Sequence, residues 1–289
     1  MDRYSANGGD LHEANSPAVP TVIEHSLADP PPVVCQCASL PRYGAAMPSR
    51  STLLKLTGAG LASVFGIAAA AGGLLYSQLY RPPDVQNARV TCSSDAPDLP
   101  ANRPLRVLIW NVQFSAGTAQ QFFYDGGEAV SVSEDIVRAT MDRIAQVIER
   151  HDPDIVLWQE LDRNSRRTAF VDQHQELMER LGHGCHVSAP YHRSPYVPHP
   201  PTDPLGRVDM HLSISSQYRI TSATRYQLPL MDESWLRRQF NLRRALLEAR
   251  MPITGGGEIT LFDTHLSAFS KGDGTLPKQI AILAEHAEA

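Results

Sequence analysis

Three polar residues stand where apolar stretches of the sequence end: Asn111, Glu160 and His265. An amide, a carboxylate and an imidazole can between them bind a cation, hydrogen-bond an anion and carry a proton. Taken singly, each has an ordinary explanation: a turn-forming Asn, a solvated Glu and a His bonded to the backbone. Open α/β folds build their sites at one edge of the sheet, where strands end. The three residues together therefore predict one polar site at such an edge.

The elements that must position these residues follow from the apolar patterning. A predicted strand precedes each of them, at 105–110, 154–159 and 258–264. Alternation of such strands with helical patterns indicates an α/β fold with a mixed sheet. The other predicted elements are strands at 210–216 and 245–251, a helix capped by Ser133 that runs to His151, a helix at 172–181 and one from Pro277.

Three motifs in series carry a resemblance to a known family. They are Val107–Val112 (Val-Leu-Ile-Trp-Asn-Val), Pro153–Glu160 (Pro-Asp-Ile-Val-Leu-Trp-Gln-Glu) and Leu261–Leu266 (Leu-Phe-Asp-Thr-His-Leu). The chain resembles the endonuclease/exonuclease/phosphatase superfamily, the metal-dependent phosphodiesterase fold of deoxyribonuclease I and the neutral sphingomyelinases. Arg243–Ala249 looks like the strand before the family's His motif, and Leu161–Thr168 is similar to its bacterial membrane-linked members. The resemblance implies a deoxyribonuclease I-like α/β sandwich of mixed sheets flanked by helices.

The resemblance also implies a role for each residue of the site. Glu160 would be a ligand to Mg²⁺ or Mn²⁺, which prefer carboxylate and water oxygens. Asn111 would support the metal or orient a phosphate oxygen through its amide. His265 would hydrogen-bond the scissile phosphate and stabilise charge as the leaving oxygen departs. The metal would act as a Lewis acid while a water attacks in line, without a covalent enzyme intermediate.

The net charge of the chain bears on which phosphoesters it could bind. Asp and Glu (31) outnumber Lys and Arg (26), so the formal net charge is −5, which argues against binding of nucleic acid through bulk positive charge. We expect a phosphoester substrate, a phospholipid or small phosphodiester ahead of nucleic acid. Arg166 and Arg167 follow the expected metal ligand closely and are predicted to bind the anionic substrate, with a solvated loop as the alternative.

Two family motifs are missing from these residues. Neither the later Gly-Asp-Phe-Asn motif nor the closing Asp-His pair occurs, and the sequence stops at Ala289 inside a predicted helix. The expectation is a fold incomplete at its C-terminal end, from a truncated product or a fragment. The motif at Gly206–Ser215 is also altered by polar residues, which suggests a changed loop. The alternative function is therefore a non-catalytic binding protein, or an inactive fragment, that retains the fold.

The amino-terminal part predicts a membrane or export segment. Residues 1–52 are rich in Pro, Ala, Ser and Gly and predict a disordered arm, unless translation starts at Met47. Within 53–80, the uncharged stretch Leu56–Leu75 is long enough to span a bilayer. A signal peptide cleaved near Ala68–Ala71 is the alternative.

Both interpretations place the rest of the chain outside the cytoplasm, either anchored to the cytoplasmic membrane by one span or secreted. Cys92 and Cys185 could pair in that oxidising compartment, with two unrelated thiols as the alternative. The Pro-rich range 81–104 predicts an extended linker before the domain at 105–289.

Overall fold

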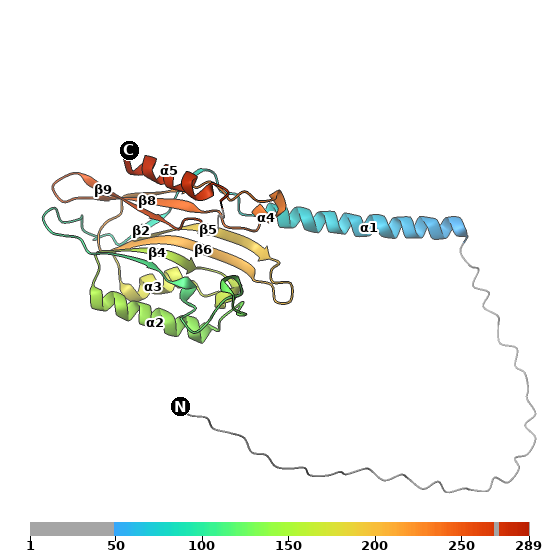
Figure 1. Ribbon diagram of the computed structural model, residues 1–289, viewed down its shortest axis with the longest axis horizontal. Coiled ribbons are helices and arrows are strands. Elements are labelled where there is room, and N and C mark those ends of the chain that lie inside the picture. Colours follow the sequence, from blue (N-terminus) through green and yellow to red (C-terminus); the bar gives the residue numbers. More distant parts are fainter. Residues whose placement is uncertain (1–48, 269–271, 289) are drawn as a thin grey trace, which may run out of the picture. The chain divides into compact units, whose positions relative to one another are not determined.

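The computed structural model describes residues 49–268 and 272–288, and Figure 1 shows the order of their elements. The chain divides into two units between residues 56 and 57. Residues 1–48, most of the expected disordered arm, lie outside the described residues. Helix α1 (Arg50–Ser77) begins inside the range expected as that arm.

Helix α1 contains the stretch that the sequence predicts as a membrane or signal segment. Ala59–Ser77 has 19 residues and a mean hydropathy of 1.7, and none of it is buried. A helix of this length rises about 28 Å, close to the ~30 Å of a bilayer core. A signal sequence meets the same criterion, so the helix is weak evidence for an anchor.

Two β-sheets lie face to face and build the folded part of the second unit (Figure 1). Only β3 and β4 run parallel, and the other neighbouring strands are antiparallel. The predicted α/β class with a two-sheet sandwich is confirmed. In spatial order, the four-stranded sheet contains β1 (Val85–Asn87), β7 (Ser222–Gln227), β8 (Ala245–Pro252) and β9 (Glu258–Thr264). The five-stranded sheet contains β2 (Val90–Cys92), β5 (Cys185–Val197), β6 (Gly206–Ser216), β4 (Ile155–Asp162) and β3 (Val107–Asn111).

Helices cover the outer faces of the sandwich. α2 (Glu134–His151) and α3 (Gln173–Leu181) lie on the five-stranded sheet, and α5 (Thr275–Glu288) lies on the four-stranded sheet (Figure 1). α2 buries the apolar positions that recur at helical spacing in the sequence, as predicted. Ser133 occupies its N-cap without a side-chain capping hydrogen bond, whereas Asp172 caps α3 by accepting from the Gln175 amide.

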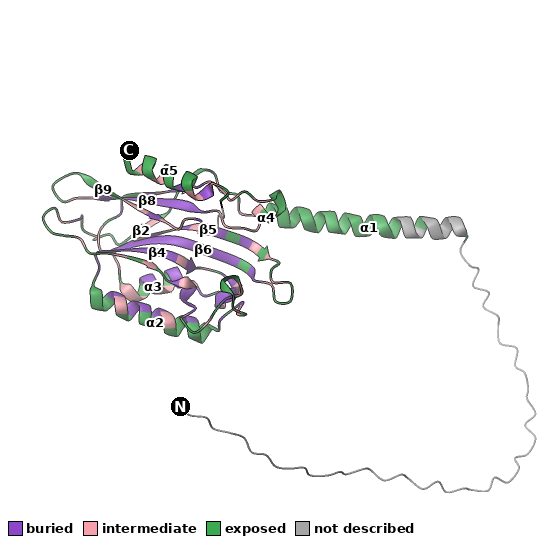
Figure 2. Cartoon of the chain, viewed as in Figure 1, coloured by how far each residue is buried: buried purple, intermediate pink, exposed green. Residues whose placement is uncertain are grey.

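The core lies between the two sheets and between the five-stranded sheet and the helices that cover it. Figure 2 shows the central strands largely buried and much of α5 exposed. Strand β4 is buried on both faces, as its continuous apolar run predicts. Its Trp158 is fully buried and donates from Nε1 to Ser215 Oγ at 2.9 Å, which satisfies the indole N–H inside the sheet.

Residues 81–104, which the sequence predicts as an extended linker, form two short strands in the structure. They contribute β1 to one sheet and β2 to the other, so this segment belongs to the sandwich. Cys92 of β2 lies directly opposite Cys185 of β5, with Cα atoms 4.0 Å apart, and the two form a disulfide. Of the two alternatives that the sequence leaves open, a disulfide or two unrelated thiols, the structure has the disulfide.

The stretch Gly206–Ser215, expected as a changed loop, is part of strand β6. Its polar side chains have partners within the sheet: Asp209 accepts from Arg193 and pairs with His211. These contacts satisfy His211 Nε2, whereas His211 Nδ1 is buried without a hydrogen-bond partner. The range 185–197, which its prolines and histidines left without a predicted strand, forms β5 beside it.

Candidate active site

The structure brings Asn111, Glu160 and His265 together. Asn111 donates from Nδ2 to Glu160 Oε1 at 3.0 Å, and His265 Nδ1 lies 3.5 Å from the same oxygen. The side chains of Glu160 and His265 are 18% and 23% exposed, so both remain accessible from solvent. Residues separated by more than a hundred positions thus share one small polar centre.

The geometry of two strands explains how Asn111 and Glu160 meet. Asn111 ends β3 and lies beside Gln159 of the parallel strand β4. The pairing of β4 with β6 is interrupted by a bulge between Trp158 and Leu161. Glu160 takes a left-handed backbone conformation there, with φ at +61°. Such a conformation is uncommon outside glycine, and a bulge re-aims a side chain.

His265 follows the end of β9 and is held by a residue that sequence reasoning missed. Tyr191 of β5 is fully buried, and its hydroxyl oxygen lies 3.0 Å from His265 Nδ1. Burial raises the pKa of Tyr191 well above its usual range, so the phenol keeps its proton. We assign that proton to a hydrogen bond into Nδ1, which leaves the N–H of the neutral ring on Nε2.

Arg244 is the second residue that sequence reasoning missed. It precedes β8, is only 6% exposed, and its guanidinium lies over the Tyr191 ring at 5.4 Å. Its Nε and Nη1 are buried without a hydrogen-bond partner. The one signal in the sequence is an arginine directly before an apolar strand, at Arg243–Ala249.

Burial and Arg244 set the protonation of the centre. Burial, followed by the charge of Arg244, lowers the pKa of His265 to about 4, so the imidazole is neutral at neutral pH. Burial raises the pKa of Glu160, against the lowering effects of the Asn111 hydrogen bond and the cations Arg167 and Arg244. The site therefore combines a neutral imidazole N–H donor, a carboxyl group that holds its proton more tightly than usual, and a cation.

These groups open into a cavity of about 360 Å³. Its polar lining includes Glu160, Arg244 and His265, whereas much of the remaining wall is apolar. A small, mostly apolar cavity with a few convergent polar groups is the usual form of a small-molecule site. The other lining residues are Phe114, Tyr124, Arg167, His192, Leu205, Met210, Met231, Asn241 and Leu242.

The two arginines predicted to bind substrate are placed differently from each other. Arg167 lines the cavity, but it is 4% exposed and its guanidinium pairs with the buried Asp162 through two hydrogen bonds. It also lies over the Phe114 ring at 3.7 Å. Arg166 pairs with Asp203 at 2.8 Å and is not among the lining residues. Arg244 also lines the cavity, and its buried Nε and Nη1 have no hydrogen-bond partner within the protein.

Among the residues that line the cavity, Glu160 supplies one carboxylate that could coordinate a divalent cation. In the part of the chain that the structure describes, no group of three or more His, Cys, Asp and Glu could hold a metal ion. The amide oxygen of Asn111 accepts from the Gln113 amide at 3.0 Å. Mg²⁺ commonly takes one or two carboxylates and completes its octahedron with water and phosphate oxygens. Glu160 fits that pattern as a single protein ligand.

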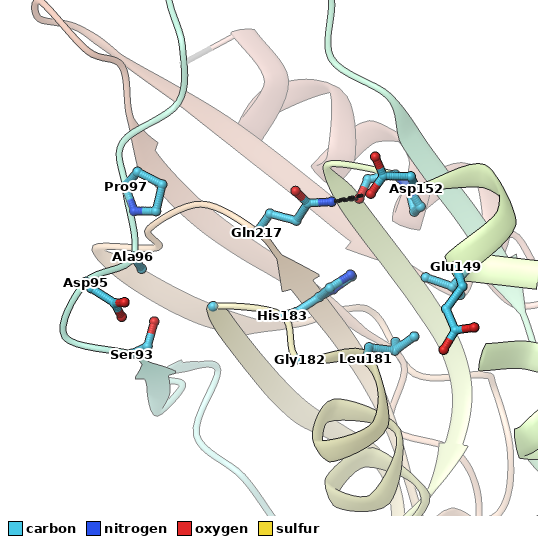
Figure 3. A pocket seen from close by; sticks show the side chains of 13 residues that line it. Ser93, Asp95, Ala96, Pro97, Glu149, Asp152, Leu181, Gly182, His183 and Gln217 are labelled. Carbon is cyan, nitrogen blue, oxygen red and sulfur yellow. Dashed lines mark hydrogen bonds between the residues drawn. The ribbon is translucent and has the colours of Figure 1, made fainter. Parts of the chain in front are cut away.

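A second hollow lies at the opposite end of the sheet, beside the start of β4, where Gln217 donates to Asp152 (Figure 3). Asp95, Glu149 and His183 also line it. Its side chains include no buried group without a partner among those that the structure describes. The cavity at Glu160 is therefore the stronger candidate.

Comparisons with known proteins give structural similarities alone. No protein-family model and no curated protein matches the chain. An endonuclease/exonuclease/phosphatase from Beutenbergia cavernae is 23% identical, with a TM-score of 0.42, over 63% of this chain and 44% of that one. A humanized D. rerio TDP2 is 14% identical, with a TM-score of 0.40, over 64% and 59% of the two chains.

A third similar structure is a Bacteroides thetaiotaomicron mannosyl-6-phosphatase, 17% identical with a TM-score of 0.39, over 64% of this chain and 59% of that one. The chain spans about half the length of the solved structures it matches.

Proposed function

We propose that the protein binds the phosphate group of a phosphoester in this cavity and hydrolyses the phosphoester bond with the help of a divalent cation, Mg²⁺ or Mn²⁺. The observation that carries the proposal is the guanidinium of Arg244, which is buried at the cavity with two nitrogens unpartnered. A buried cation with unmade hydrogen bonds is costly, and an anion that accepts those hydrogen bonds removes much of the cost. A phosphate oxygen is a suitable acceptor for a guanidinium N–H.

The other residues of the site have separate tasks. His265 would donate from Nε2 to a phosphoryl or leaving-group oxygen, because Tyr191 occupies its Nδ1. Asn111 would orient Glu160 or a phosphate oxygen through its amide. Glu160 would hold the cation, which when bound supplies Lewis-acid polarisation of a phosphoryl oxygen. The apolar wall would exclude water and strengthen these interactions.

The form of the cavity favours one class of phosphoester. Its wall includes Phe114, Leu205, Met210, Met231 and Leu242, which would pack against an apolar group next to the phosphate. This supports a phospholipid or a small phosphodiester as substrate. A net charge of −5 supports nucleic acid less.

We further propose that α1 anchors the domain to the cytoplasmic membrane with the cavity outside the cytoplasm. The apolar stretch Ala59–Ser77 and the disulfide between Cys92 and Cys185 support this location, since disulfides persist in oxidising compartments. Secretion after signal cleavage is the alternative. Membrane fractionation separates the two, because recovery only in the soluble fraction would reject the anchor.

The activity is tested with the purified full chain and four substrates: bis(p-nitrophenyl) phosphate, sphingomyelin, phosphatidylinositol and DNA. We expect hydrolysis of the small diester or a phospholipid with Mg²⁺ or Mn²⁺, and none with a chelator. Arg244→Ala should lower kcat/KM by about 10- to 100-fold, the value of hydrogen bonds to a charged group. Arg250→Ala is the matched control, because Arg250 is exposed on strand β8, which Arg244 directly precedes. No hydrolysis with either cation would reject the enzyme.

One observation favours a second function, phosphoester binding without turnover. Among the residues that the structure describes, Glu160 does not belong to a group of three or more His, Cys, Asp or Glu side chains that could hold a metal ion. Affinity for a phosphate ester that depends on Arg244, with no hydrolysis under any of those conditions, would establish this alternative.

A further inference from the structure

A short exposed segment forms part of the rim of the cavity. Met231 and Leu242 both line the cavity, and the chain between them contains helix α4 (Trp235–Arg238). The side chains of Trp235 and Leu236 at this helix are each 63% exposed. We call residues 231–242 the rim segment. Its ends belong to the site, while its middle presents two large apolar side chains to solvent.

Arginines outnumber acids in the sequence around these apolar side chains, with Arg237, Arg238 and Arg243 against Asp232 and Glu233. Arg237 is exposed and Arg238 is partly buried within α4, and Arg243 follows the rim segment. Burial, then the neighbouring cations Arg81 and Arg238, hold the pKa of Arg243 below its usual range. The arginines thus gather at one place, and aromatic or apolar side chains among basic ones are typical of segments that bind the interface of a bilayer.

The end of the candidate span lies close to the same face of the domain. α1 ends at Ser77, and Tyr80 already packs on the domain, with its ring 5.4 Å from the Arg193 guanidinium and 5.7 Å from that of Arg225. Three residues reach at most about 10 Å. The Tyr76 ring also stacks on that of Trp235 at 6.2 Å between centroids. The rim segment therefore lies where a membrane crossed by α1 would end.

We propose that the rim segment is a membrane-contact surface: Trp235 and Leu236 enter the headgroup layer of an anionic bilayer, and the neighbouring arginines bind its lipid phosphates. A bilayer is the occupant because the surface adjoins the candidate span, carries an aromatic side chain suited to the interface, and exposes Arg237 beside it, which can bind a lipid phosphate. The contact holds the mouth of the cavity at the membrane surface. The proposed membrane contact does not require catalytic activity. If the protein hydrolyses phosphoesters as proposed above, the contact presents the cavity to phospholipid.

The test uses the full chain reconstituted in nanodiscs, with the fluorescence of Trp235 as the readout. The chain has three tryptophans, and the difference between wild type and Trp235→Phe isolates the emission of Trp235. We expect lipids with a nitroxide near the headgroup to quench that emission at least about twofold, and lipids labelled deep in the acyl chain to quench it less. Val107→Trp in the Trp235→Phe background is the control, because Val107 is 45% exposed at the opposite end of β3 from Asn111.

A second readout tests the role of charge. The Trp235 quenching should be stronger in discs with phosphatidylglycerol than in discs of phosphatidylcholine alone, and Arg237→Gln should weaken that preference by about fivefold. Equal emission of Trp235 in plain and nitroxide lipid, or equal quenching of Trp235 and of the tryptophan at 107, would overturn the proposal. The fivefold change refers to the ratio of Trp235 quenching between the two kinds of disc. Because no hydrolysis is measured, this result is independent of the enzyme assay.

Discussion

The hydroxyl of Tyr191 lies 3.0 Å from Nδ1 of His265, and both side chains lie next to Arg244. Tyr191→Phe removes the hydrogen bond and leaves the ring that Arg244 covers. We expect kcat to fall about tenfold, the effect of losing one hydrogen bond of about 1.4 kcal/mol, because Nε2 loses its fixed N–H. KM should change little, since Tyr191 does not line the cavity.

Steady-state kinetics on the favoured substrate measures both constants. Tyr196→Phe is the control, because Tyr196 is 45% exposed and belongs to the same strand β5. A tenfold rise in KM with kcat unchanged would show that Tyr191 binds substrate and does not position His265.

Glu160→Gln should have opposite effects on the metal-free and metal-loaded protein. Burial raises the pKa of Glu160, so the native state holds its proton more tightly than the unfolded chain does. The associated stability is present at low pH and is lost as the pH rises through the folded pKa. At pH 7.5 without metal, the neutral Gln should therefore raise Tm.

With Mg²⁺ added, wild type should gain Tm and Glu160→Gln should not, because the variant lacks the carboxylate that would hold the cation. Differential scanning calorimetry measures both, with the exposed Glu285→Gln as the control. An equal Mg²⁺-induced rise in the Glu160 variant would reject Glu160 as the metal ligand.

Asp263 should make the stability of the domain depend on pH. It is 2% exposed between the sheets, it accepts from the Gln159 side chain, and burial raises its pKa to about 8. Its contribution to stability is full below the ordinary pKa of about 4 and is lost as the pH rises toward 8. Asp263→Asn keeps the acceptor oxygen and removes the titration.

The advantage of Asp263→Asn in free energy of unfolding should grow by on the order of 4 kcal/mol between pH 5 and pH 8. Urea titrations at the two pH values check this. A variant whose difference from wild type is the same at both pH values would show that Asp263 does not titrate in this window.

The disulfide between Cys92 and Cys185 should carry a large part of the stability. It closes a loop with a sequence separation of 93 residues, for which loss of the crosslink costs about 4 kcal/mol through the entropy of the unfolded chain. Replacing both cysteines with Ala should lower the urea midpoint accordingly. Wild type treated with dithiothreitol should match the double variant, and an unchanged midpoint after reduction, verified by thiol titration, would contradict this role.

Much of the fold could be predicted from the sequence, because its central elements have strong local patterns. The buried strand before Glu160 is a continuous apolar run, and the Gly-rich turn at 255–257 joins β8 to β9. The strands at 85–92 could not be predicted, since each is only three residues long and exists through pairing with distant strands.

The site could be predicted only in part. Asn111, Glu160 and His265 follow apolar strands and carry motifs, so local sequence marks them. Tyr191 reaches His265 across 74 positions, and that contact depends on how the two sheets pack. Arg167 is adjacent to Arg166 in sequence, yet its pairing with Asp162 is set by the 3₁₀ turn after β4. Spacing along the chain does not reveal which arginine keeps free donors.

Phosphate binding by the unpartnered guanidinium of Arg244 is measured most directly by isothermal titration calorimetry of the full chain with inorganic phosphate, with and without Mg²⁺. Wild type and Arg250→Leu should bind phosphate, and Arg244→Leu should bind it about 10- to 100-fold more weakly while remaining folded. Equal phosphate affinity of wild type and Arg244→Leu would contradict the assignment of this cavity as a phosphoester site.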